Sequence, residues 1–267
     1  MTRFDHLEFE DPSSRTAAKS SGFRSTTGTP MRDAEYYLEE AEQAYRLGDY
    51  ESALRFYSKA LEDDHTCFPG WFGQVRMLLE LGEYKEAGIW ADRALEMFPE
   101  QPDLLSAKGV AALRMGFVDS AMAYSDNALS KRDASPYCWL ARTEILLSRR
   151  SKMADHCVAQ VVNTASSGKA RARMGFELSR VLRRYGRLSQ ALVYASASAQ
   201  ALPGDAAVWL ELGRCQRLLG MNEAGTSFEQ ALHLNPNLDR AREELLSFNH
   251  RGLTGRLRML LRRLRRR

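Results

Sequence analysis

The chain has 267 residues, of which 44% are hydrophobic and 27% charged, so it is long and apolar enough to bury a sizeable core. No run approaches the ~18 consecutive apolar residues of a membrane-spanning helix, and we expect no signal peptide, because the first residues lack a basic and then apolar pattern. The four cysteines are scattered, which excludes a disulfide framework and fits reduced side chains in a cytoplasmic protein.

The net charge of +4 is unevenly distributed along the chain. Residues 251–267 contain eight arginines and no acid, and removing this +8 from the total of +4 leaves the preceding 250 residues at −4. The basic character is therefore a property of the C-terminal tail and does not extend to the rest of the protein.

Residues 1–32 contain ten Ser or Thr side chains and little periodicity, which predicts a disordered N-terminal tail. One stretch differs, because Phe4, Leu7 and Phe9 alternate with acidic residues. Two interpretations stay open for this stretch: a docking peptide that folds on binding, or a tail that never orders.

A period of 34 residues begins at Ala34. Ala53, Ala87 and Ala121 are each 34 residues apart, and glycines recur at the same interval five residues before each of them. A period of this length is typical of an array of helix pairs that stack to bury a common core.

The spacing resembles the tetratricopeptide repeat, which places small residues at positions 8, 20 and 27, a glycine near 15 and a proline near 32. The resemblance implies an all-α fold, a right-handed superhelix of about six helix-turn-helix repeats, in which glycine ends the first helix of a pair and proline stops the second. Residues 237–250 carry spaced apolar side chains, which predicts a helix that caps the last repeat. The expected array spans 33–236, with repeats near 34–67, 68–101, 102–135, 136–168, 169–205 and 206–236.

The period is broken once, after the fourth repeat. That repeat has Arg149, Arg150 and Ser151 where the others have glycine, and 163–168 adds residues without a proline. We expect a distorted joint here between two sub-stacks of repeats; the alternative is a surface insertion that the array tolerates.

The resemblance further implies that the first helix of each repeat lines a concave groove. The groove would run from acidic through apolar to basic, with only Glu177 and Glu211 as acids on the helices that carry the basic end. It would fit a partner segment with an apolar centre and an acidic end. The predicted groove residues are Phe72, Arg76, Leu79, Val110, Leu113, Tyr137, Leu140, Glu144, Arg173, Phe176, Arg180, Arg183, Arg214 and Arg217.

Residues 251–267 form the basic tail, in which four leucines share one helical stripe among the arginines. Such a tail suits an anionic membrane surface or a partner protein better than nucleic acid, because no aromatic residue is interleaved for base stacking. A solvated, unstructured tail is the remaining alternative. The residues expected to meet an anionic surface are Arg256, Leu257, Arg258, Leu260, Leu261, Arg262, Arg263 and Leu264.

No pattern in the sequence points to catalysis. The five histidines are dispersed, and no phosphate-binding or nucleophile motif occurs, so we expect no enzyme activity, cofactor or metal site. The sequence therefore predicts a cytoplasmic scaffold or adaptor that binds a protein segment in its groove, with the tail allowing a peripheral position at the inner face of a membrane. The alternative is a nucleic-acid-associated factor that uses the tail and the arginine-rich end of the groove, and self-association is a third possibility.

Overall fold

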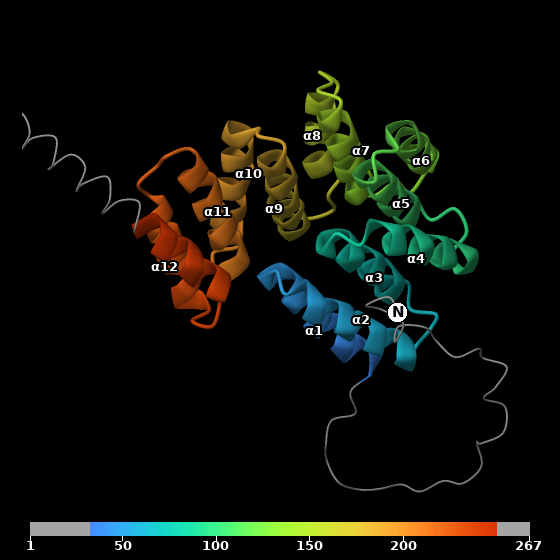
Figure 1. Ribbon diagram of the computed structural model, residues 1–267, viewed down its shortest axis with the longest axis horizontal. Coiled ribbons are helices and arrows are strands. Elements are labelled where there is room, and N and C mark those ends of the chain that lie inside the picture. The colour runs from blue at the N-terminus through green and yellow to red at the C-terminus, as the bar shows by residue number, and fades with distance from the viewer. Residues whose placement is uncertain (1–32, 250–267) are drawn as a thin grey trace, which may run out of the picture.

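The computed structural model describes residues 33–249, and this part of the chain is built entirely from helices (Figure 1). Twelve helices form six consecutive antiparallel pairs, followed by a further helical segment at 239–249. The all-α superhelix of helix pairs is therefore confirmed. The pairs are α1 (Ala34–Leu47) with α2 (Tyr50–Asp63), α3 (Phe68–Leu81) with α4 (Tyr84–Met97), α5 (Pro102–Arg114) with α6 (Val118–Ser130), α7 (Pro136–Ser148) with α8 (Ala154–Asn163), α9 (Gly168–Arg184) with α10 (Leu188–Ala201), and α11 (Ala206–Leu218) with α12 (Ala224–Leu234).

A left-handed residue ends the first helix of every pair. In five pairs this residue is a glycine, whose lack of a Cβ makes a positive φ inexpensive. In the fourth pair the same turn is made by Arg150, with φ of 52°. The missing glycine of this repeat is therefore replaced by a strained residue, and the turn itself is kept. The five glycines are Gly48, Gly82, Gly116, Gly186 and Gly220.

The predicted small residues let the helices approach closely. Ala53, Ala87 and Ala121 are all fully buried. A Cβ added at Gly73 of α3 would lie 2.2 Å from the ring of Tyr57 on α2. The two helices therefore approach each other here more closely than a residue with a Cβ would allow.

The joint expected between the fourth and fifth repeats is present in a different form. Helix α8 is short, with 10 residues, and α9 is long, with 17. However, one apolar cluster joins Val158 and Val161 of α8 to Phe176 and Leu178 of α9, so the core is continuous across the boundary. What changes at the expected joint is therefore the helix length and not the continuity of the core; the change from one large apolar cluster to the next falls within α7.

The array curls until its first repeat meets its last ones (Figure 1). Leu47 of α1 packs against the apolar cluster of the last repeat, which also contains the buried Leu238, just before the helix at 239–249, and the buried Ala241 within it. Arg46 lies 3.2 Å from Asp205 at the start of α11, and the guanidinium of Arg240 lies over the ring of Tyr50. We call this arrangement the closed ring.

Candidate functional site

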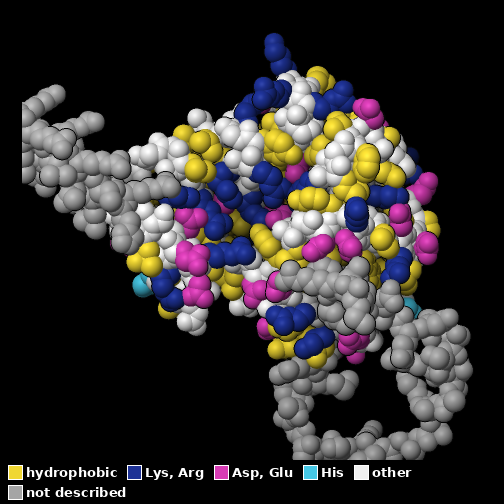
Figure 2. Space-filling view, in the orientation of Figure 1, with side chains coloured by type: hydrophobic (Ala, Val, Ile, Leu, Met, Phe, Trp, Pro, Cys, Tyr) yellow, Lys and Arg dark blue, Asp and Glu magenta, His cyan; other side chains and the backbone are white. Residues whose placement is uncertain are grey.

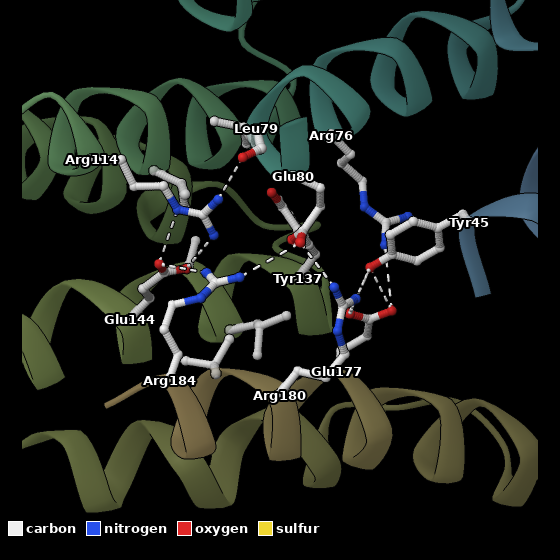
Figure 3. A pocket seen from close by; sticks show the side chains of 14 residues that line it. Tyr45, Arg76, Leu79, Glu80, Arg114, Tyr137, Glu144, Glu177, Arg180 and Arg184 are labelled. Carbon is white, nitrogen blue, oxygen red and sulfur yellow. Dashed lines mark hydrogen bonds and ion pairs between the residues drawn. The ribbon is translucent and has the colours of Figure 1, made fainter. Parts of the chain in front are cut away.

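The predicted groove residues lie on the first helices of pairs two to six, α3, α5, α7, α9 and α11. Half of them surround a cavity at the centre of the closed ring, which we call the central cavity (Figure 3). Those that line it are Arg76, Leu79, Val110, Tyr137, Leu140, Glu144 and Arg180.

The other predicted residues are distributed around it. Phe72 packs edge-on against Tyr137, whereas Leu113 packs with Ala121 and Ile145 in a separate apolar cluster. Arg173 lines a different groove, between α1, α9 and the last repeat. The remaining four, Phe176, Arg183, Arg214 and Arg217, lie on α9 and α11 toward the last repeats.

The central cavity is small. It has a volume of about 40 Å³, which is room for no more than a few water molecules. Its apolar wall is closed, because Leu79, Val110 and Leu140 are each at most 7% exposed. In this conformation the chain's own side chains fill the middle of the concave face, and a peptide does not fit there.

Arg180 connects the two ends of the ring. Its guanidinium donates hydrogen bonds to the Tyr45 hydroxyl at 2.8 Å and to the carboxylate of Glu80 at 2.8 Å, and it also contacts Glu177. The Tyr45 hydroxyl in turn lies 2.7 Å from both carboxylate oxygens of Glu177. Because Tyr45 belongs to the first repeat and Glu177 to the fifth, these bonds hold the ring closed (Figure 3).

Glu144 is the second anchor of the central cavity. This carboxylate is only 4% exposed and accepts from Arg114 and Arg184, each at 3.1 Å. Arg184 also lies 3.5 Å from Glu80, so it bridges the buried carboxylate of Glu144 and the partly buried carboxylate of Glu80. Buried acids are thus shared between arginines of different repeats, which is the condition under which buried charge is tolerated.

The same pattern continues toward the last repeats. Arg183 binds Glu211 through a bidentate pair at 2.7 and 3.0 Å, and Arg214 and Arg217 share Glu244 at 3.0 and 3.1 Å. The expectation that only Glu177 and Glu211 are near these arginines was therefore incomplete. Glu80, Glu144 and Glu244 also reach them from other helices.

Counting these ion pairs gives the concave face an excess of positive charge. Seven arginines pair with five glutamates, and each of four carboxylates serves two arginines. In two of these contacts the arginine is nearer the solvent: Arg184 is 39% and Arg183 26% exposed, against 4% for Glu144 and 2% for Glu211. Figure 2 accordingly shows Lys and Arg side chains gathered at the centre of this face.

These contacts set protonation states in the central cavity. Burial on its own raises the pKa of Glu80, but Arg180, Arg184 and Arg114 outweigh it and hold that pKa below its usual value. Burial raises the pKa of the Tyr45 and Tyr137 hydroxyls well above their ordinary value. At neutral pH Glu80 is therefore ionised and both tyrosines are neutral, and the Tyr45 hydroxyl donates to Glu177.

Nothing in the described part of the chain is arranged to hold a metal ion: residues 33–249 contain no group of three His, Cys, Asp or Glu side chains placed for it. No helix within the same residues is long and apolar enough to span a membrane. The acidic N-terminal stretch and the Arg/Leu residues predicted for an anionic surface lie outside the described residues.

The tetratricopeptide repeat family profile matches residues 38–102. Among solved structures, yeast Tom70 superimposes with a TM-score of 0.54 at 17% identity, covering 88% of this chain and 50% of Tom70. A tetratricopeptide repeat protein of Thermus thermophilus superimposes with a TM-score of 0.53 at 16% identity, covering 69% of this chain and 99% of that one. These likenesses show the fold.

Among curated proteins, the CTR9 homolog of Arabidopsis thaliana is 29% identical over 130 residues, which cover 46% of this chain. The match spans only 12% of that protein's length, so it extends over a small part of the relative. The profile match shows that residues 38–102 are tetratricopeptide repeats, and with the 34-residue period and the six helix pairs it shows that the described part of the chain has the fold of such an array. Arrays of this kind present extended concave surfaces on which other proteins bind.

Proposed function

We propose that this chain is a non-catalytic scaffold that binds a segment of a partner protein on the concave side of its ring. The proposed segment has an acidic end, which meets the exposed edges of the arginines, and an apolar centre. The observation that carries this proposal is the excess of seven arginines over five glutamates on that face. An arginine guanidinium donates two parallel hydrogen bonds to a carboxylate. An exposed arginine that shares its glutamate with another arginine can therefore bind a further carboxylate.

Two parts of the predicted groove play different roles in this proposal. Arg183, Arg184, Arg214 and Arg217 are 20% to 39% exposed and reachable in the closed ring. Leu79, Val110 and Leu140 of the central cavity are covered, so a partner's apolar side chains reach them only when the first repeat moves away from the fifth. The acidic end is therefore expected to bind first.

Affinity capture with the full chain and quantitative mass spectrometry tests this proposal. Arg184→Glu together with Arg217→Glu should reduce recovery of the specific partner at least fivefold, and more so at low salt. In the variant, Glu80 keeps Arg180, Glu144 keeps Arg114 and Glu244 keeps Arg214, so each carboxylate retains one arginine, and the urea midpoint of the variant checks that it is folded.

The matched control is Lys152→Glu together with Lys169→Glu, an equal change of charge at two exposed residues that do not line the central cavity. Capture that is equal for the double variant and this control removes the arginines of the concave face from the binding surface.

The Arg/Leu tail is proposed to bring the scaffold to an anionic membrane surface, since its pattern combines four leucines with arginines on the other sides. Co-sedimentation with phosphatidylserine-containing vesicles should fall when Leu257, Leu260 and Leu261 are replaced by Ser. Binding of the same proteins to a single-stranded RNA is measured in parallel. If the chain binds RNA but not vesicles, and the Leu→Ser changes leave its RNA binding unchanged, the nucleic-acid alternative is favoured.

A further inference from the structure

Closure of the ring creates a groove that the sequence did not indicate. It lies along the seam where the C-terminal half of α1 faces α9, the turn before α11 and the end of α12, and we call it the seam groove. Its volume is about 530 Å³, against about 40 Å³ for the central cavity. This is within the range of ordinary ligand sites, so the seam groove admits whole side chains.

The walls of the seam groove combine apolar and cationic side chains. Leu47, Leu202 and Leu234 supply the apolar part. Arg46 and Arg173 supply two positive charges against one carboxylate, that of Asp205, which lies 3.2 Å from Arg46. Arg173 is exposed at the groove. The chemistry that fits is therefore a peptide with large apolar side chains and a carboxylate for Arg173.

A segment with this chemistry is present in the chain itself. Residues 4–11 contain the apolar side chains Phe4, Leu7 and Phe9 and four acids. They lie outside the described residues, and we propose that they dock in the seam groove, with the apolar side chains against its leucines and a carboxylate on Arg173.

The chain between residues 4–11 and the seam groove is long enough for this docking. Residues 11 to 34 span up to roughly 75 Å when extended. The seam groove starts near the far end of α1, a helix of 14 residues, and is thus about 21 Å from its first residue. Connection through one chain also gives an effective concentration on the order of millimolar, so even a weak contact is occupied.

Docking of this segment regulates access to the seam. The bound segment covers Arg173 and bridges the first repeat to the last ones, so it stabilises the closed ring and competes with any acidic partner that enters there. Because the docking is intramolecular, it is tested without a partner and stands or falls separately from the scaffold function.

The test uses two forms of the full chain and a fluorescent synthetic peptide of residues 1–14. In one form Asp5→Lys, Glu8→Lys and Glu10→Lys reverse the charge of the attached segment and leave the groove empty. Fluorescence anisotropy should show saturable binding of the peptide to this form and at least tenfold weaker binding to the wild-type chain, whose own segment competes.

Variants of the groove locate the peptide. Arg173→Glu, added to the charge-reversed form, should weaken peptide binding about five- to tenfold, because one attraction is replaced by a repulsion. Lys152→Glu is the matched control and should change nothing. Peptide in which Phe4 and Phe9 are replaced by Ser should also lose binding, since the apolar contacts are then missing.

Three outcomes overturn the proposal. Equal binding by the wild-type and charge-reversed chains shows that the attached segment does not compete, and binding insensitive to Arg173→Glu places the peptide elsewhere. If the peptide fails to bind while Arg173→Glu abolishes capture of an acidic partner, the seam groove belongs to that partner instead.

Discussion

Removing the Arg180 guanidinium is the sharpest perturbation of the closed ring. This side chain is 13% exposed, and one guanidinium nitrogen contacts Tyr45 and Glu177 while the other contacts Glu80. In Arg180→Met the volume of the side chain is largely retained, so the change removes charge and hydrogen bonds and leaves little cavity.

The expected loss of stability follows from what each partner retains. Breaking a buried ion pair usually costs about 3–5 kcal/mol, because a charge is left uncompensated. Here Glu80 keeps Arg184 at 3.5 Å and Glu177 keeps Arg76 at 3.6 Å, so neither carboxylate is left alone. The loss is then that of two weakened charge-assisted contacts, about 2–3 kcal/mol.

Urea unfolding of the full chain measures this loss, and small-angle X-ray scattering measures the shape. The variant should show a lower free energy of unfolding and a larger radius of gyration, because the first repeat is released from the fifth. Unchanged scattering together with unchanged stability would refute the reasoning that Arg180 closes the ring.

Three further predictions concern single positions. Arg150→Gly should raise the free energy of unfolding by about 1 kcal/mol, because glycine adopts a φ of 52° without strain; a decrease in urea midpoint would contradict it. Gly73→Ala should cost about 1–3 kcal/mol, since the new Cβ overlaps the Tyr57 ring, and a neutral effect in the same assay would show that the helices separate easily. Acidification should destabilise the chain through Glu80: its pKa in the folded state lies below its ordinary 4.5, so its contribution is complete above that pH and is lost as the pH falls further. Unfolding free energies should fall less steeply for Glu80→Gln as the pH drops from about 5 to about 3, and parallel curves would be evidence against this role.

The helix pairs were predictable because each repeat is determined by local features. Gly48 and its equivalents end the first helix, and Ala53 and its equivalents allow the close approach, and both recur in the sequence at a fixed interval. Such features act within one repeat or between neighbours, so the period alone is enough to place them.

Closure of the ring was not predictable in this way. It is the sum of small rotations at each junction between repeats, and it brings together Tyr45 and Glu177, which are 132 residues apart. Glu80 was missed for the same reason, because it approaches Arg180 across a separation of 100 residues. Seven of the fourteen predicted groove residues line the central cavity, but the partners of these side chains depend on the curvature.

The measurement that tests the closed ring most directly is a double-mutant cycle between its two ends. Tyr45→Phe and Glu177→Gln are each made alone and together in the full chain, and the free energy of unfolding is measured for all four proteins. If the Tyr45 hydroxyl bonds Glu177 in solution as in the structure, the two changes should be coupled by about 1 kcal/mol or more. Effects that add within about 0.3 kcal/mol would mean that the first and fifth repeats do not touch, and the array would be open.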